Sequence, residues 1–332
     1  MSELRRQLGS LIVCGFDNAV LPANLNSLLE QGSLGGIILF ARNYVSSSKL
    51  TSLTKTISAV SNGRAFIAVD QEGGRVVRFD GDFPVFPSPL HFGKRNDLEG
   101  LLNGTSVTAK ALRTHGVNLN LVPVCDLDPE DSAHVLHSRA FSHDVKIASD
   151  CAKAQVEVLK ANNVISCAKH FPGLASATGD PHFQVSFSAR TLEEFRKSDY
   201  EPFRAAIAAG VDMIMPTHLR APALDESNIV TFSHKVLQDE LRGHLGFTGL
   251  IISDDLQMLG ALEGVSQIEA GKLALAAGCD LLIYANLQET IESLLDGLEA
   301  CATADDKLRE RISESYQRVV AFQNNNPQYF SA

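Results

Sequence analysis

The stretch Val164-Ile165-Ser166-Cys167-Ala168-Lys169-His170-Phe171-Pro172-Gly173 is an apolar, β-forming run that ends abruptly in ionisable residues. A second run, Leu250-Ile251-Ile252-Ser253-Asp254-Asp255, has the same form. Runs that are apolar throughout are typical of strands buried on both faces of a parallel sheet. Parallel α/β proteins carry their active sites at the carboxyl ends of such strands. The two stretches therefore predict buried parallel strands with a functional site at one end.

Eight apolar runs of this kind alternate with segments of helical periodicity, and one helical segment begins at a capping box, Thr191 with Glu194, and ends at Gly210. Eight strand–helix repeats predict an α/β fold, a (β/α)8 TIM-type barrel that forms a single domain over residues 1–332, with a C-terminal helix after Asp305. An open doubly wound sheet is the alternative, but the sequence lacks the GxGxxG fingerprint that would support it. The expected strands are Ser10–Phe16, Gly36–Phe40, Phe66–Asp70, Val117–Val124, Val164–His170, Val211–Pro216, Gly249–Ser253 and Asp280–Tyr284.

The composition is typical of a globular protein with a large core and argues against nucleic-acid and membrane partners. The chain has 332 residues, of which 45% are hydrophobic and 20% charged, enough for a large core. A net charge of -10 argues against a nucleic-acid partner. No stretch approaches the roughly 20 apolar residues of a membrane span, and no signal-peptide pattern is present. The six cysteines form no CxxC pair, which is typical of reduced thiols. We expect a cytoplasmic monomer without membrane or nucleic-acid partners.

Ionisable residues stand at most of the predicted strand ends, and a barrel brings those ends to one pocket. Three chemistries fit them. Glycoside transfer needs a carboxylate and a proton donor on opposite faces of a sugar. Metal-assisted hydrolysis would draw on the histidines and one aspartate, although no HxH or HExxH pair occurs. A Schiff base would form at a lysine in an apolar pocket. The metal ligands would be His170, His182, His218 and Asp254, and the Schiff-base residue would be Lys169.

Seven short motifs lie along the chain in a characteristic order: GGIILFARN (35–43), AVDQEGGRV (68–76), SRAF (138–141), KHFPG (169–173), DPH (180–182), MPTH (215–218) and SDDL (253–256). With these motifs the chain resembles the bacterial β-N-acetylglucosaminidases (β-hexosaminidases) of glycoside hydrolase family 3, as a single-domain member, over nearly its whole length. Each motif alone is modest evidence, but their order and spacing together are highly specific.

The resemblance implies a barrel with the sugar bound at its mouth. The family's nucleophile is the first Asp after Ser in a Ser-Asp-Asp motif, which corresponds to Asp254. Its acid/base is a His on a mobile loop after the fifth strand, which corresponds to His182, and an Asp that orients this His corresponds to Asp180. The resemblance gives no role to Asp126 or His218. The family's sugar-binding positions correspond to Asp70, Arg78, Arg139, Lys169 and His170.

Elementary chemistry agrees with these implied roles. A carboxylate can attack the anomeric carbon and form a covalent glycosyl-enzyme, which leads to retention of configuration. Imidazole titrates near neutral pH, so a histidine can donate and then accept the proton. An adjacent Asp can fix the imidazole tautomer, as in a catalytic triad. For Asp255 we expect support of its neighbour or helix capping.

The acid/base loop departs from the family pattern at two places. The family reads His-Phe-Pro-Gly-His-Gly, but Leu174-Ala175 occupy the last two positions here, and Pro181 replaces the Ser of the family's Asp-Ser-His. Pro181 fixes its own φ and biases Asp180 towards extended backbone. These departures bear on efficiency and leaving-group preference more than on the class of reaction.

We therefore expect a retaining exo-β-N-acetylglucosaminidase that removes terminal non-reducing GlcNAc from peptidoglycan-derived muropeptides, with GlcNAc–anhydroMurNAc fragments as the implied substrate. It would need no metal and no organic cofactor. Within the family, the alternatives are a broad-specificity β-glycosidase and a GlcNAc phosphorylase. From other classes, the alternatives are a catalytically weak sugar-binding protein and a metal-dependent hydrolase.

Overall fold

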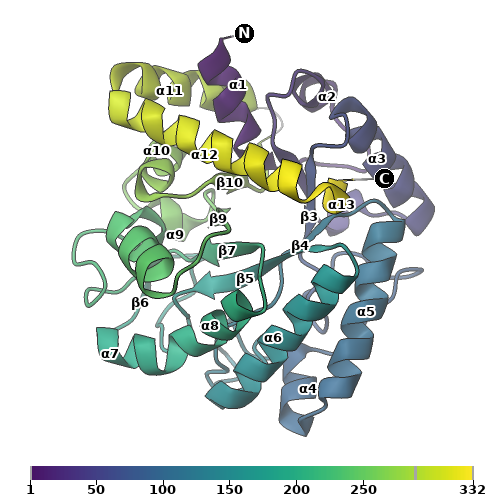
Figure 1. Cartoon of the computed structure of the whole chain (residues 1–332), viewed down its shortest axis with the longest axis vertical. Coiled ribbons are helices and arrows are strands. Elements are labelled where there is room, and N and C mark those ends of the chain that lie inside the picture. The colour runs from purple at the N-terminus through teal and green to yellow at the C-terminus, as the bar shows by residue number, and fades with distance from the viewer. Residues whose placement is uncertain (1, 288–289, 331–332) are drawn as a thin grey trace.

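The computed structural model describes residues 2–287 and 290–330 and contains a closed barrel of eight parallel strands (Figure 1). Each strand pairs with the next along the chain, and the last strand pairs with the first to close the ring. The predicted (β/α)8 TIM-type barrel is confirmed, although residues 1, 288–289 and 331–332 of the predicted range 1–332 lie outside the described residues. The barrel strands are β1 (Ile12–Cys14), β2 (Gly36–Leu39), β3 (Phe66–Val69), β4 (Leu119–Asn120), β5 (Ile165–Phe171), β7 (Met213–Pro216), β9 (Leu250–Asp255) and β10 (Leu281–Tyr284).

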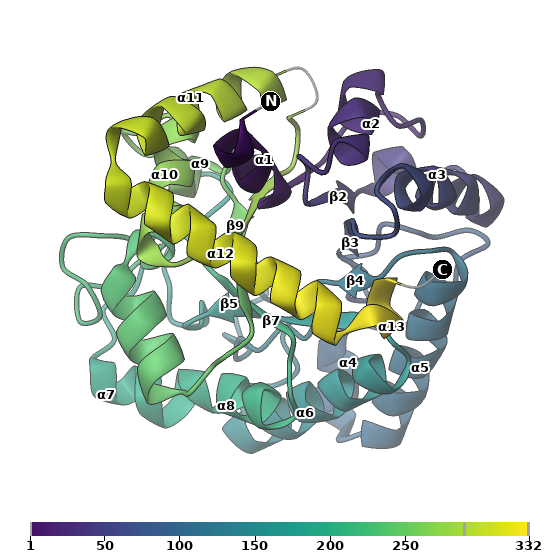
Figure 2. The ribbon, with the colours of Figure 1, turned by 45° about the horizontal axis from the view of Figure 1, so that its top comes forward.

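Helices surround the barrel and connect its strands (Figure 2). Most of the long helices begin at a Ser or Asp whose side chain accepts a hydrogen bond from a free first-turn N–H, as at Asp144 and Ser266. The helices are α1 (Glu3–Ser10), α2 (Ala23–Glu30), α3 (Ser47–Val60), α4 (Pro89–Arg95), α5 (Leu98–Thr114), α6 (Val145–Ala161), α7 (Leu192–Glu194), η2 (Phe195–Asp199), α8 (Tyr200–Ala208), η4 (Lys235–His244), α9 (Leu259–Leu262), α10 (Gln267–Ala277), α11 (Ile291–Ala304), α12 (Asp306–Asn325) and α13 (Pro327–Phe330), with short 3-10 turns η1 (Ala41–Asn43) and η3 (Val230–Phe232).

The predicted capping box is present at the start of α7, where Thr191 and Glu194 bond to each other's backbone N–H. The helical stretch runs on through η2 and α8 and ends just before Gly210, whose φ of 82° suits a glycine after a helix. The predicted C-terminal helix is also present as α12, which begins at the N-cap Asp305.

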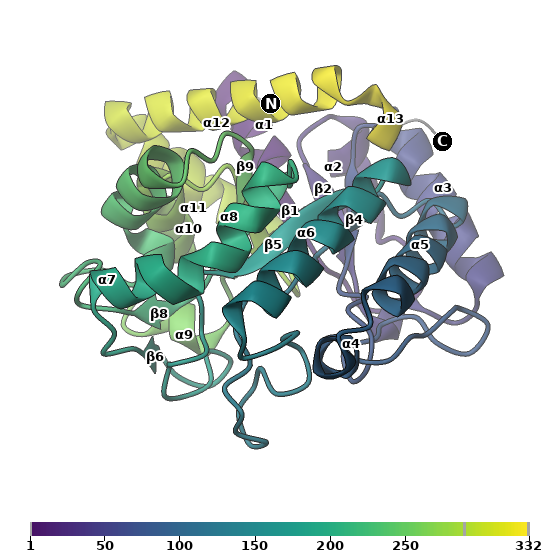
Figure 3. The ribbon, with the colours of Figure 1, turned by 60° about the horizontal axis from the view of Figure 1, so that its bottom comes forward.

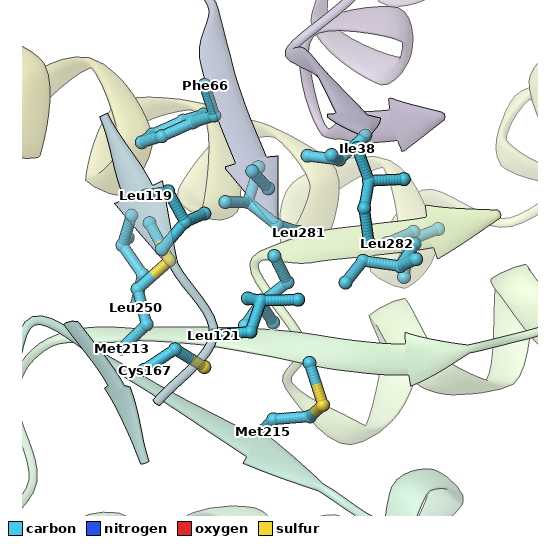
Figure 4. Close-up of a cluster of buried hydrophobic side chains, with 14 of the residues drawn as sticks. Ile38, Phe66, Leu119, Leu121, Cys167, Met213, Met215, Leu250, Leu281 and Leu282 are labelled. Carbon is cyan, nitrogen blue, oxygen red and sulfur yellow. The ribbon is translucent and has the colours of Figure 1, made fainter. Parts of the chain in front are cut away.

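Apolar side chains from all around the ring fill the barrel, so it encloses a packed core and no channel (Figure 4). The side chains labelled in Figure 4 include Phe66, Met215 and Cys167, which come from three different strands. All six cysteines are free thiols, and five of them are buried. No helix in residues 2–287 and 290–330 has both the length and the apolar composition needed to cross a membrane.

The two ends of the barrel are covered differently (Figure 3). Helix α12 crosses the end where the strands begin, and its Phe322 packs against Phe66, the first residue of β3. Arg311 and Arg318 of α12 pair there with the buried Asp280, just before β10. Long loops and α9 gather at the opposite end, where the strands finish. That end is the one at which strand-end residues can meet.

Two details of the strands differ from prediction. The run Val117–Val124 yields only the short β4, because Pro123 has no N–H to donate and interrupts the ladder before one bridge forms again at Val124. A separate two-stranded sheet, β6 (Ser186–Phe187) with β8 (Leu219–Arg220), was not predicted, because two residues are too few to show a period. This small sheet ties the loop after β5 to the loop after β7.

Candidate active site

A cavity of about 460 Å³ lies at the carboxyl ends of the barrel strands. Its floor is made by apolar side chains of the barrel, among them Leu121 and Met215, so it is closed from below. Seven of the eight residues predicted for the site line this cavity, and the eighth, Asp180, contacts one of the seven. The seven are Asp70, Arg78, Arg139, Lys169, His170, His182 and Asp254.

Lys169 is the centre of a buried ionic cluster on one side of the cavity. Its Nζ lies 2.7 Å from Asp70 Oδ1, at the end of β3, and 2.7 Å from Glu72 Oε1. Glu72 also accepts two hydrogen bonds from the Arg139 guanidinium, at 2.8 and 2.9 Å. Arg78 Nη2 lies 3.3 Å from Asp70 Oδ2. Each carboxylate therefore has cationic partners, as buried charges require.

The cluster keeps its groups ionised. Burial lowers the pKa of Lys169, but Asp70 and Glu72 outweigh burial and raise that pKa above its ordinary value. Burial likewise raises the pKa of Glu72, but Arg139 and Lys169 bring it well below its ordinary value. A lysine held as ammonium has no free electron pair, so this geometry disfavours Schiff-base chemistry at Lys169. It favours donation of hydrogen bonds to a polar ligand.

His170 is fixed by Asp126. The His170 Nδ1–H donates to Asp126 Oδ2 at 2.6 Å, and the His170 backbone N–H donates to the same oxygen at 3.1 Å. The other Asp126 oxygen accepts the N–H of Leu174 at 2.8 Å. With Nδ1–H donating, His170 Nε2 is an acceptor, and it accepts a long hydrogen bond from Arg139 Nη2 at 3.4 Å. Asp126 thus sets the tautomer and ring orientation of His170, a role that the sequence did not reveal.

Asp254 lies at the end of β9, half-buried, with one face on the cavity. Its Oδ1 accepts the backbone N–H of Asp255 at 2.8 Å, and among the described residues no hydrogen bond is made to Oδ2. Burial raises the pKa of Asp254, but His218, His170 and that N–H outweigh it and hold the pKa below its ordinary value. Asp254 is therefore an ionised carboxylate with one oxygen held and the other free.

Asp180 and His182 form a local pair on the loop between β5 and β6. Asp180 Oδ1 accepts both the His182 Nδ1–H at 2.7 Å and the His182 backbone N–H at 2.9 Å. The His182 side chain is 54% exposed, and its ring lines the cavity. With Nδ1 occupied, Nε2 is the atom that can exchange a proton with a ligand.

The two departures in this loop have structural consequences. Leu174, which replaces the family's polar His, is buried in the core, and its N–H is held by Asp126. Pro181 is also buried, although His182 beside it is exposed. The loop therefore has apolar anchors at these two points.

His218 is buried and is not among the residues that line the cavity. Its Nε2–H donates to the carbonyl oxygen of Asp255 at 3.0 Å, and its Nδ1 lies 2.9 Å from the Thr231 hydroxyl. Burial lowers the pKa of His218, against the attraction of Asp254. Both ring nitrogens are occupied, so His218 is not placed as a metal ligand. Among the described residues no three His, Cys, Asp or Glu side chains are grouped so that they could hold a metal ion.

Comparison with known proteins identifies the family. The model of the glycosyl hydrolase family 3 N-terminal domain matches residues 3–322. The chain belongs to glycoside hydrolase family 3. It is 37% identical over 297 residues to a β-hexosaminidase from Nitrosomonas eutropha, covering 88% of this chain and 85% of that one.

Solved structures of the family share this barrel. NagZ of Neisseria gonorrhoeae in complex with N-trifluoroacetyl-D-glucosamine is similar with a TM-score of 0.79 and 30% identity over 96% of both chains. A family 3 β-N-acetylglucosaminidase from Paenibacillus is similar with a TM-score of 0.91 and 27% identity over 100% of this chain, which spans 64% of the Paenibacillus chain. The predicted enzyme class, a glycoside hydrolase, is confirmed.

Two residues of this family 3 site had no role predicted from the sequence. Glu72 joins Lys169 to Arg139, and Asp126 orients His170. Both stand just beyond a predicted strand, which was the available signal, but only the packing of neighbouring strands reveals their partners. Without Glu72, two cations at the cavity would lose the carboxylate that fixes their positions.

Asp255 provides a pH-dependent prediction for this glycoside hydrolase. Burial raises its pKa from about 3.9 to about 6, although its Oδ1 accepts the N–H groups of Gln257 and Ala285. Because the folded state binds this proton more tightly than the unfolded state, stability is lost as pH rises from about 4 to 6. Asp255→Asn keeps an acceptor and removes the charge. It should raise the free energy of unfolding by about 3 kcal/mol at pH 7.5.

The advantage of Asp255→Asn should shrink as pH falls towards 4, where both states of the wild type carry the proton. Urea denaturation of the wild type and of Asp255→Asn at pH 4.5, 6 and 7.5 measures this difference in the free energy of unfolding. A difference that is the same at all three pH values would contradict the raised pKa.

Proposed function

We propose that this family 3 enzyme is a retaining exo-β-N-acetylglucosaminidase in which Asp254 is the nucleophile, His182 the acid/base and Asp180 its orienting partner. The observation that carries the proposal is that one cavity holds a carboxylate with a free oxygen and an imidazole whose Nδ1 is occupied by Asp180. Relatives named β-hexosaminidase and a relative solved with an N-acylated glucosamine support the sugar.

In the first step, Asp254 Oδ2 attacks the anomeric carbon while the bond to the leaving oxygen breaks, and His182 gives that oxygen its proton. The product is a glycosyl ester of Asp254. In the second step, water attacks the same carbon from the opposite face and gives a proton to His182, and the ester bond breaks. Each step inverts the carbon, so the net outcome is retention.

The shape and lining of the cavity support exo action and recognition of a sugar. Its floor is the packed interior of the barrel, so only a chain end fits into it. Lys169, Arg139, Arg78 and His170 present N–H donors or a ring nitrogen, and Asp70 presents acceptors, which suits a polyhydroxylated sugar. Fixed partners such as Glu72 and Asp126 keep these groups in place before the ligand arrives.

The natural source and setting are part of the proposal. The motifs shared with bacterial β-N-acetylglucosaminidases favour muropeptide fragments as the source of terminal GlcNAc. Six free thiols favour a reducing compartment such as the cytoplasm. We also propose that residues 1–332 form one catalytic domain that acts as a monomer and without a cofactor.

Turnover of 4-nitrophenyl β-GlcNAc, followed by proton NMR, tests the function. The first sugar released should be the β-anomer, and added phosphate should not divert it to GlcNAc 1-phosphate. Initial release of the α-anomer would contradict the retaining mechanism. Failure to cleave any GlcNAc glycoside, with binding of GlcNAc intact, would indicate a sugar-binding protein.

Lys169→Ala should weaken the binding of GlcNAc itself, because the ammonium faces the cavity where sugar hydroxyls would lie. It should also lower the free energy of unfolding by roughly 3–5 kcal/mol, because Asp70 and Glu72 lose a buried partner. Calorimetric titration with GlcNAc at a temperature where the variant is folded measures the first effect. Unchanged affinity would remove Lys169 from the sugar site.

A further inference from the structure

The tip of the acid/base loop, residues 180–184, touches the short helix that follows the nucleophile strand. Gly260 of α9 donates its backbone N–H to the carbonyl oxygen of Pro181 at 3.0 Å. Its N–H is one of the first in α9, where no helical partner exists and no side chain caps the helix. Among the described residues, no other hydrogen bond joins residues 180–184 to a different element.

The contact leaves no room for a side chain. A Cβ added at Gly260 would lie 2.7 Å from the Pro181 carbonyl oxygen, 3.0 Å from the Gln184 carbonyl oxygen and 3.2 Å from His218 Cβ. These atoms are backbone on both sides of His182 and the stem of a buried side chain. Gly260 has no positive φ, so its backbone conformation is open to any residue. Glycine is therefore required at position 260 because a side chain would collide with the acid/base loop.

The contact also connects the two reacting groups. Asp254 lies at the end of β9, and α9 follows it directly in the chain. His218 donates to the carbonyl oxygen of Asp255 and lies against Gly260. Pro181, which accepts from Gly260, is buried and directly precedes His182. The contact therefore fixes the position of His182 relative to β9, the strand that carries Asp254.

We propose that Gly260 is a positioning residue for the acid/base: its N–H and its missing side chain hold Pro181 against α9, and this keeps His182 on the cavity beside Asp254. The inference rests on the proposed role of His182. Its consequence is that a substitution at Gly260 acts through proton transfer, and leaves the attack of Asp254 largely intact.

Gly260→Ala tests the proposal, with Gly243→Ala as the matched control. Gly243 is also helical without a positive φ, and a Cβ there would meet only the Gln238 carbonyl oxygen, at 3.3 Å. Gly260→Ala should lower kcat/KM for chitobiose on the order of 10²-fold, as expected for a displacement of about 1 Å. For 4-nitrophenyl β-GlcNAc, whose leaving group needs little protonation, the loss should stay below about tenfold. Gly243→Ala should match the wild type with both substrates.

Two further measurements separate positioning from a general packing defect. In a His182→Ala background, Gly260→Ala should cause almost no further loss with chitobiose, because both changes act on one imidazole. Hydrogen exchange should be faster in peptides spanning residues 176–187 of Gly260→Ala, and unchanged in Gly243→Ala.

Equal losses with both substrates that add fully to those of His182→Ala would overturn the proposal, as would unchanged exchange in the loop. If the wild type and Gly243→Ala both fail to cleave GlcNAc glycosides, the proposed function is wrong. In that case, hydrogen exchange in residues 176–187 is the measurement that tests whether Gly260 holds the acid/base loop.

Discussion

Asp254→Ala is expected to reduce turnover of 4-nitrophenyl β-GlcNAc by several orders of magnitude, in the range of roughly 10⁴–10⁶ found when a central catalytic residue is removed. The Asp254 carboxylate supplies the electron pair that displaces the leaving group. The other carboxylates that line the cavity are engaged by other partners and cannot replace it. Asp70 is engaged with Lys169 and Arg78, and Asp255 has its Oδ1 bonded to two backbone N–H groups.

Stereochemistry checks this prediction. With Asp254→Ala and an activated β-glycoside, added azide should attack the anomeric carbon once and give the α-glycosyl azide. The variant should fold normally, because Asp254 makes no ion pair and only one backbone hydrogen bond among the described residues. Circular dichroism and the melting temperature provide the control. Retention of more than about a tenth of the wild-type rate would exclude Asp254 as nucleophile.

His182→Ala should give the second largest effect, and its size should depend on the leaving group. With chitobiose the departing alkoxide must be protonated, so the loss should be on the order of 10²–10⁴. With a nitrophenol leaving group, formation of the glycosyl-enzyme needs little proton donation and should be retained far better. Added azide should now give the β-glycosyl azide, because it attacks the intermediate on Asp254.

Asp180→Ala should follow the same pattern, because it leaves the His182 ring without the acceptor that holds Nδ1–H at 2.7 Å. The double variant should lose little more than His182→Ala alone, since both changes impair one imidazole. Comparing kcat/KM for chitobiose and for the nitrophenyl glycoside across the three variants measures this coupling. A loss at His182 that is equal for both substrates, with none at Asp180, would mean that His182 only packs the loop.

Much of the architecture was accessible from the sequence because the barrel strands are short apolar runs, most of which end in or just before a charged or polar residue. Lys169–His170 and Asp254–Asp255 show this most clearly, since a buried strand cannot continue through such residues without partners. Once a parallel barrel is inferred, its geometry brings those ends together, and the structure places seven of the eight predicted residues on one cavity.

The remaining features depend on contacts between segments that no periodicity records. Asp126 was visible only as a strand-end carboxylate and Glu72 only as part of the motif at 68–76, because the partners of both come from neighbouring strands and loops. Leu174 looked like a loss in the loop motif, yet it is buried and adds to the core. Gly260 gave no signal, because a lone glycine in a short segment is usually read as a turn residue. The absence of its side chain matters only once Pro181 lies against it.

The most direct test of the mechanism is to trap the covalent intermediate. An activated 5-fluoro derivative of GlcNAc slows both steps but keeps the first faster, so the glycosyl-enzyme accumulates and its peptide can be identified by mass spectrometry. We expect one sugar attached to Asp254, lost slowly on dilution into buffer. Attachment to Asp255 or Asp70, or turnover of the same compound without any labelled peptide, would contradict it.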